Sequence, residues 1–142
     1  MAYSDDDDLL LQISFADLAR LSGDDTGSAI DEDRVGEARR NSDALIDSFL
    51  SGRYKLPLES VPEIIRTISI DLTVYFLHEY RYRDSLIPTA IVALRVNSER
   101  VLSMIQKGDL VLFESTNNPP EIITNKTGFK IFQGNKTDVF FS

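Results

Sequence analysis

Residues 50–65, LSGRYKLPLESVPEII, separate two helix-like stretches and decide how the chain is folded. Leu56 and Val61 each precede a proline, and a residue before proline is pushed out of the α region. We therefore expect the chain to run extended from residue 53 to about residue 61. The segment is predicted to be a stiff joint that ends one helix, fixes a crossing and begins the next.

Both ends of this joint carry helix signals. Gly52 follows the last apolar turn of the preceding helix and suits a left-handed C-terminal cap. Ser60 and Glu63 have the spacing of a capping box, which would place Pro62 inside the first turn of the next helix. We expect Tyr54, Leu56 and Leu58 to pack downward and hold the segment. The candidate joint residues are Arg53, Tyr54, Leu56, Pro57, Leu58 and Pro62.

Apolar periodicity on either side of the joint predicts a mainly α fold, a small helical bundle. Asp31 is expected to open a helix over residues 31–51, since acidic residues follow it in the first turn. The next helix, at about 61–83, is apolar on several sides, which is typical of a central bundle helix or a subunit interface. A further helix is predicted at 88–107. Two short helical pieces, about 8–13 and 15–21, precede them, the second capped by Ser14.

The character of the chain changes after Gly108, which is expected to end the last helix. The segments LVLFE, EIITNK, GFKIFQ and TDVFFS are rich in residues that favour strands and are separated by turn signals. About 34 residues cannot bury a sheet of their own. We therefore expect a helical domain over 1–108 and a short β-like C-terminal extension over 109–142, packed on the bundle or on a neighbouring subunit.

Composition limits the classes of protein that this chain can represent. Of its 142 residues, 42% are hydrophobic and 27% charged, ordinary values for a folded domain. No long uncharged apolar run is present, so we expect no membrane span. The acidic N-terminus lacks the basic start of a secretory signal. The absence of cysteine excludes disulfides and thiolate metal sites and fits synthesis in the cytosol.

The formal net charge of −8 is concentrated at the N-terminus. Residues 1–33 carry ten acidic residues and one arginine, whereas the remainder is nearly balanced. Acidic runs of this kind are usually solvated ends, the interpretation that we favour. The alternative is a surface that repels nucleic acid or meets a basic neighbour. Binding of nucleic acid through this face is not expected, because phosphate binding needs clustered Lys and Arg.

Few residues point to catalysis or metal binding. The single histidine, His78, lacks the partner residues of a zinc site. The loop GDDTGSAIDED, read as a calcium loop, matches in residue type only at Asp24 and Asp33, so a plain acidic turn is favoured. No nucleophile elbow or phosphate loop occurs. We predict a protein that is not an enzyme, with no catalytic residues, no metal and no cofactor.

Basic residues interleaved with tyrosines form one candidate contact patch in the segment 79–83, EYRYR. Such a patch could stack on nucleic acid, but we favour contact between subunits, in which Tyr and Arg are common anchors. On the helix over 31–51, Arg34, Arg39 and Arg40 could meet the acidic N-terminal face of a neighbour. The patch residues are Tyr80, Arg81, Tyr82 and Arg83.

The order of these signals resembles a Mu-like bacteriophage and prophage family of proteins of unknown function, associated with head–tail joining. An acidic loop ending in AID is followed by DALIDSFLSGRYKLPL and then by VPEIIRTISIDLTVYFL. The resemblance covers about residues 3–108, and RY-x-LPL with a following VP is its most specific part. The matching residues include Ile46, Asp47, Leu50, Arg53, Tyr54, Leu56, Pro57, Leu58, Val61, Pro62, Asp71 and Leu77.

The resemblance implies a head–tail connector, or adaptor, subunit that joins a ring between portal and tail. Its implied partners are copies of itself in the ring, the portal and tail-side proteins, with DNA at most passing through. The resemblance implies that the protein is located in the virion, and in the cytoplasm of the host bacterium during assembly. The alternative is a small acidic protein-binding or regulatory module without catalysis.

Overall fold

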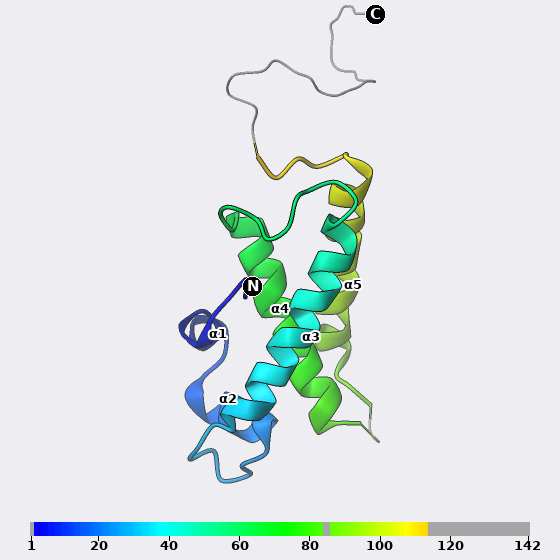
Figure 1. The fold of residues 1–142 in the computed structure, drawn as a ribbon. Coiled ribbons are helices and arrows are strands. Elements are labelled where there is room, and N and C mark those ends of the chain that lie inside the picture. Colours follow the sequence, from blue (N-terminus) through cyan, green and yellow to red (C-terminus); the bar gives the residue numbers. More distant parts are fainter. Residues whose placement is uncertain (1, 84–85, 114–142) are drawn as a thin grey trace, which may run out of the picture. The chain divides into compact units, whose positions relative to one another are not determined.

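The computed structural model describes residues 2–83 and 86–113 and consists of helices joined by short loops (Figure 1). The chain divides into two units, Met1–Leu112 and Phe113–Ser142, and the first contains every helix described below. The predicted mainly α fold is confirmed. The helices are α1 (Asp6–Gln12), α2 (Phe15–Ser22), α3 (Glu32–Leu50), α4 (Glu63–Arg81) and α5 (Thr89–Lys107).

The two short pieces expected near the N-terminus are α1 and α2. Asp5 caps α1 in a capping box, since its side chain accepts from the N–H of Asp8 and the Asp8 side chain accepts from the N–H of Asp5. Ile13 is extended and breaks the helix. Ser14 then caps α2 by accepting a hydrogen bond from the N–H of Asp17 at 3.1 Å, as the sequence predicted.

Helix α3 begins as predicted but ends differently. The Asp31 side chain accepts from two N–H groups of the first turn. At the other end Gly52 is not in the left-handed region, so the predicted glycine cap is wrong. The N–H groups of Arg53 and Tyr54 both bond to the Leu50 carbonyl, at 3.0 and 2.8 Å. These turns satisfy the last carbonyl without a positive φ, so no glycine is required there.

The joint departs from its prediction in two respects. Residues 53–61 form turns and bends, not an extended run, and the Leu56–Pro57 peptide bond is cis. Pro62 is the N-cap of α4, with φ −62° and ψ 152°, and no side chain caps this helix. The predicted capping box is therefore wrong. The fixed φ of proline suits an extended N-cap as well as a first helical turn, so the residue type did not distinguish them.

Helix α4 is central, as its apolar residues on several sides predicted, and it contacts α1, α2, α3 and α5. Its buried side chains belong to two clusters. One contains Leu72 and joins α3, α4 and α5, and the other contains Leu77 and joins α1, α2, α3 and α4. The N-terminal helices are therefore fixed to the bundle by a core of their own. No helix in the described part of the chain is long and apolar enough to cross a bilayer.

Helix α5 ends at Gly108, which has a φ of +88° and is the left-handed cap that the sequence predicted. Leu110 and Leu112 then pack against the core cluster that contains Leu72. Residues 109–113 are bends and include no strand. The remainder of the predicted β-like extension, 114–142, lies outside the described residues, and the proposed domain boundary at 108/109 stays a prediction.

Candidate interaction surfaces

The joint residues hold the end of the bundle together. The exposed Arg53 side chain donates from Nε to the Gln106 carbonyl at 3.2 Å and so caps the last turn of α5. Its guanidinium lies so close to Gly108 that a Cβ there would fall 2.9 Å from Nη2. Glycine at this position therefore permits both the positive φ and the approach of Arg53.

The apolar residues of the joint face inward, as expected. Leu58 is buried, and Tyr54 and Leu56 pack against the core cluster that contains Leu72. The Tyr54 hydroxyl accepts a hydrogen bond from the N–H of Leu112 at 3.1 Å, which ties the segment after α5 to the joint. Pro57 is exposed. These residues make contacts within their own chain, and their use between subunits stays a prediction.

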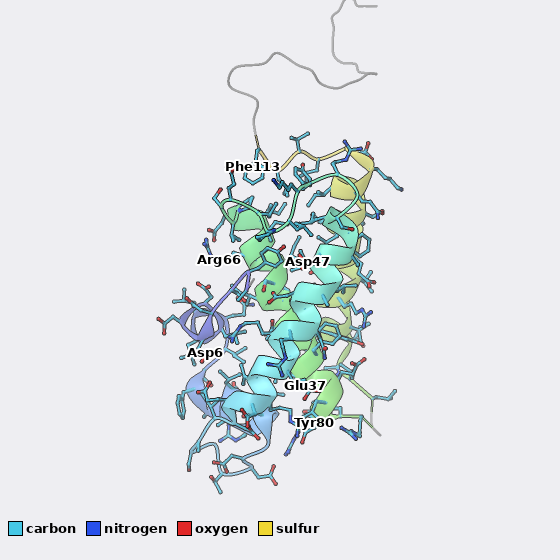
Figure 2. The ribbon with its side chains drawn as sticks, in the orientation of Figure 1. Asp6, Glu37, Asp47, Arg66, Tyr80 and Phe113 are labelled. Atoms are coloured by element: carbon cyan, nitrogen blue, oxygen red, sulfur yellow. The ribbon has the colours of Figure 1, made fainter. Side chains whose placement is uncertain are left out.

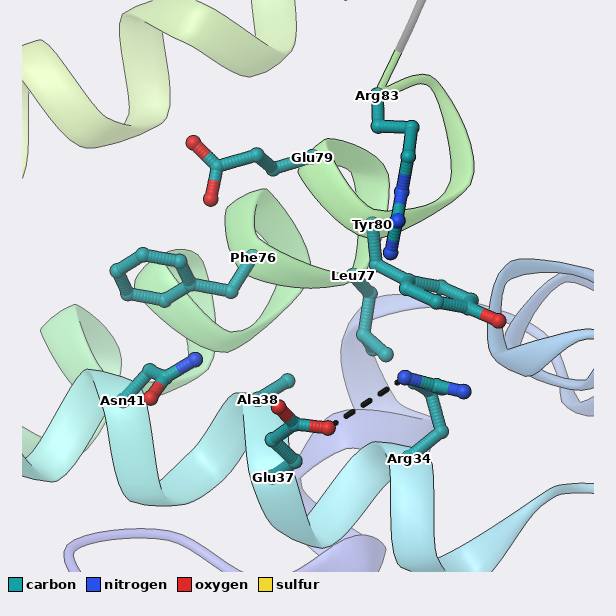
Figure 3. Close-up of a pocket in the computed structure, with 9 residues that line it drawn as sticks. All are labelled: Arg34, Glu37, Ala38, Asn41, Phe76, Leu77, Glu79, Tyr80 and Arg83. Atoms are coloured by element: carbon teal, nitrogen blue, oxygen red, sulfur yellow. Dashed lines mark hydrogen bonds and ion pairs between the residues drawn. The ribbon is translucent and has the colours of Figure 1, made fainter.

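Tyr80, at the opposite end of α4, lies between two guanidinium groups. Arg34 of α3 is 3.6 Å from the centre of the ring and Arg83 is 5.4 Å from it. Figure 3 shows Arg83 above the ring and Arg34 below it, with Arg34 also paired to Glu37. This ion pair measures 3.4 Å. Tyr80 thereby joins the end of α4 to the first turn of α3.

A shallow hollow of about 300 Å³ lies beside Tyr80 (Figure 3). Its lining includes two carboxylates and two guanidinium groups. One carboxylate, that of Glu37, forms an ion pair with one guanidinium group, that of Arg34. This mixed lining does not select an anion or a cation. Among the described residues, no group of three or more His, Cys, Asp or Glu could hold a metal ion. The lining residues are Arg34, Glu37, Ala38, Asn41, Phe76, Leu77, Glu79, Tyr80 and Arg83.

The other residues of the predicted basic and aromatic patch also have contacts within the chain. Arg81 forms an ion pair with Asp25 in the loop between α2 and α3. The Tyr82 ring stacks on His78, with centroids 5.9 Å apart. Nδ1 of His78 lies 2.8 Å from the Val74 carbonyl, so the histidine is engaged within its own helix. All four patch residues thus have contacts within the chain, although Arg81, Tyr82 and Arg83 are exposed.

The loop GDDTGSAIDED, which resembles a calcium loop in part, is closed by its own hydrogen bonds. The Asp24 carboxylate accepts from the N–H groups of Thr26, Ser28 and Ala29, at 3.0, 3.2 and 2.8 Å. The Thr26 hydroxyl also donates to it, and this bond is the main reason why the pKa of Asp24 is lowered. Asp24 therefore acts as the acceptor of a tight turn, which is the plain interpretation that the sequence favoured.

Part of the N-terminal acidic run is paired with the bundle. Asp6 accepts a hydrogen bond from Nη2 of Arg39 at 2.6 Å, and Asp8 lies 3.8 Å from Nε of Arg66. Figure 2 labels Asp6 and Arg66, one member of each pair. The hydrogen bond from Arg39 lowers the pKa of Asp6. Arg39, considered from the sequence as a contact for the acidic face of a neighbour, pairs here with the acidic run of its own chain. Asp7 is exposed and forms no ion pair with the described residues.

The sequence of this chain matches a known protein family. Residues 3–130 match the family described as Bacteriophage Mu, Gp36. This chain belongs to the bacteriophage Mu gp36 family. The match extends beyond residue 108, where the resemblance was expected to end, so residues 109–130 are part of the gp36 pattern.

A curated relative agrees with the gp36 assignment. The chain is 30% identical over 82 residues to the Mu-like prophage FluMu protein gp36 of Haemophilus influenzae. The alignment covers 58% of this chain and 58% of the relative. The expected kinship with Mu-like phages and prophages is thereby confirmed.

Sequence reasoning missed two groups of exposed apolar residues on this gp36 chain. Leu11 and Phe15, beside the acidic run, are 87% and 50% exposed. On α5, Val96 is 56% exposed. The sequence did indicate exposure on α1, because the three consecutive leucines 9–11 cannot all face the same side of a helix. Likewise, Val92 and Val96 lie off the stripe that carries the inward residues Leu102 and Ile105.

The Asp6–Arg39 pair predicts a pH dependence. Because the folded-state pKa of Asp6 is lowered, its contribution is present above the unfolded pKa of about 3.9 and is lost as pH falls through the folded value. Asp6→Asn should lower the free energy of unfolding by about 0.5–1 kcal/mol at pH 7, since the pair is partly exposed. Thermal unfolding at a series of pH values measures this.

The matched control is Asp7→Asn, which removes one acid from the same helical turn without breaking an ion pair among the described residues. We expect the stability gap between wild type and Asp6→Asn to close at acidic pH, and Asp7→Asn to show no such gap. Equal losses in the two variants at pH 7 would mean that the Asp6–Arg39 contact adds nothing.

Proposed function

We propose that this gp36-family chain is a non-catalytic structural subunit that joins phage head to tail, between the portal and tail-side proteins. The observation that carries the proposal is the membership of this chain in the bacteriophage Mu gp36 family. The head–tail role itself is taken from the sequence resemblance to proteins associated with head–tail joining. In this proposal the subunit acts in the virion, after assembly in the host cytoplasm, and forms a ring with other copies of itself.

The way in which the charged residues are used supports a docking role. Arg34, Arg39 and Arg81 contact Tyr80, Asp6 and Asp25, so these charges fix helices and loops to one another. The joint similarly fixes the ends of α3 and α5. A subunit that transmits a fixed geometry between two large assemblies needs such a stiff body.

Exposed apolar side chains provide the second line of support. A single exposed leucine is ordinary on a monomer, whereas several on one face mark a surface for another protein. Leu10 and Leu11 are adjacent exposed residues on α1, and Val92 and Val96 lie four residues apart on α5 and are both exposed. DNA enters the proposal only as a passing molecule, since a net charge of −8 disfavours adhesion to phosphates.

Deletion of the coding sequence from an inducible prophage tests the proposal. We expect full heads and separate tails by electron microscopy after induction, no infectious particles, and recovery of both from a plasmid copy. The protein should also be present in purified wild-type virions by mass spectrometry. Normally joined particles from the deletion strain would overturn the proposal. Altered timing of induction with joined particles would favour the regulatory alternative.

A further inference from the structure

One exposed face is formed by α1. Asp7 and Leu11 are four residues apart and therefore lie on the same side of α1. Leu10 adds further exposed apolar area on the same helix, and Leu11 is 87% exposed. We call Asp7, Leu10 and Leu11 the N-terminal face. It combines an apolar centre with an acidic side chain that has no ion pair in the part of the chain that the structure describes.

A second exposed face runs along α5. Val92, Val96 and Arg100 follow one another at intervals of four residues, so they form one stripe on the helix. All three are exposed. Arg100 forms no ion pair within residues 2–83 and 86–113 and makes only a 3.4 Å hydrogen bond to Asn97 on its own helix. We call Val92, Val96 and Arg100 the α5 face.

The two faces lie on opposite sides of the bundle. Helix α5 packs on α3 and α4, whereas α1 packs on α4 and α2 packs on α3 and α4. Figure 1 shows α1 and α2 to the left of the α3–α4 pair and α5 to its right. One subunit can therefore engage a neighbour through each face at the same time.

We propose that the N-terminal face of one copy of this chain docks on the α5 face of the next copy, in a head-to-tail contact that builds the ring. The inference rests on the proposed function. In this register Leu11 meets Val96 and Asp7 meets Arg100. The spacing agrees, because both Leu11–Asp7 and Val96–Arg100 span four helical residues, or about 6 Å. Helix α1 of one copy and helix α5 of the next copy would run antiparallel in this contact.

Charge and apolar patterning select a second copy as the partner. Asp7 and Arg100 have opposite charges, and each has an exposed apolar residue, Leu11 or Val96, four positions away on its own helix. An antiparallel contact of the α5 face with itself, centred on Val96, would instead set Arg100 against Val92. Two different faces in contact give a heterologous interface, which closes into rings when the rotation permits.

Cysteine cross-linking tests the contact, because the natural chain has no cysteine. Full-length Leu11→Cys protein is mixed with size-tagged Val96→Cys protein and oxidised across a concentration series. We expect the mixed disulfide to exceed either self-linked product by about tenfold, the factor for a preference of 1.4 kcal/mol. The control pair Ser28→Cys with Val96→Cys joins exposed residues outside the register and should give background yield.

A second arm tests the charged contact. Asp7→Arg, added to the Leu11→Cys chain, should reduce the mixed yield roughly two- to fivefold, and Arg100→Asp in the partner chain should restore it. Failure of the mixed disulfide to exceed the control pair at every concentration overturns the inference. Unjoined heads and tails in the deletion strain, together with that failure, would leave the proposed function standing and remove this interface alone.

Discussion

Replacing Tyr3 with alanine should lower the free energy of unfolding by about 3–5 kcal/mol. Tyr3 is only 2% exposed and belongs to the core cluster that contains Ile46 and Leu72, although it precedes the first helix. Its hydroxyl donates to the Asp47 carboxylate, and its N–H lies 3.4 Å from Oδ1 of Asp43. Truncation removes both the ring and the hydrogen bond. Urea denaturation of the full chain measures the loss.

Tyr3→Phe separates the two contributions. It keeps the ring in the core and removes only the hydroxyl, so the expected loss is about 1.5–3 kcal/mol, typical of a hydrogen bond to a charged group. Burial, followed by the bond to Asp47, raises the pKa of Tyr3, so the hydroxyl stays protonated at neutral pH. Equal losses in Tyr3→Phe and Tyr3→Ala would show that the ring contributes no packing energy and would contradict the prediction.

The long helices were predictable because their sequences agree at several levels. Asp31 offered an N-cap, and the apolar residues after it recur at helical spacing. Gly108 supplied the one residue type that enters the left-handed region without strain. The observed helices α3 and α5 begin and end within one residue of the predicted ranges 31–51 and 88–107. Local signals suffice where they point to one structure.

The joint was less predictable because its shape depends on packing. Pro57 and Pro62 predict that the helix is interrupted. They do not predict the direction in which the chain turns, or which isomer the Leu56–Pro57 bond adopts. The direction is set by Leu58, which reaches the core, and by Tyr54, which bonds to Leu112. This last contact joins residues 58 positions apart, and no local pattern encodes it.

The contacts that the candidate surface residues make within the chain were not predictable for the same reason. Arg39 was considered as a contact for a neighbouring subunit. The sequence does not show that Asp6, 33 positions away, lies beside it. The sequence likewise does not show that Arg34 lies over the ring of Tyr80. The exposed Leu11 and Val96 were overlooked, since apolar residues are assigned to the core by default. Exposure of an apolar side chain is decided by which neighbouring helices are present.

The other large effect is expected for Leu72→Ala, which should lower the free energy of unfolding by about 2–5 kcal/mol. Leu72 is fully buried in α4 and shares a cluster with Ile46 of α3 and Leu102 of α5. The helices are tied together elsewhere by the joint, so they cannot close fully around the smaller side chain, and the cavity adds to the lost burial. Denaturant titration of the full chain gives the value.

The matched control for this substitution is Leu86→Ala, because it makes the same chemical change at a side chain that is 95% exposed. Its expected effect lies within about 0.5 kcal/mol of zero. If Leu72→Ala were as mild as this control, the three long helices would not share a close-packed core. The rigid subunit on which the docking proposal depends would then be lost, because interfaces at opposite sides of α3 and α4 could not hold a fixed angle between successive copies.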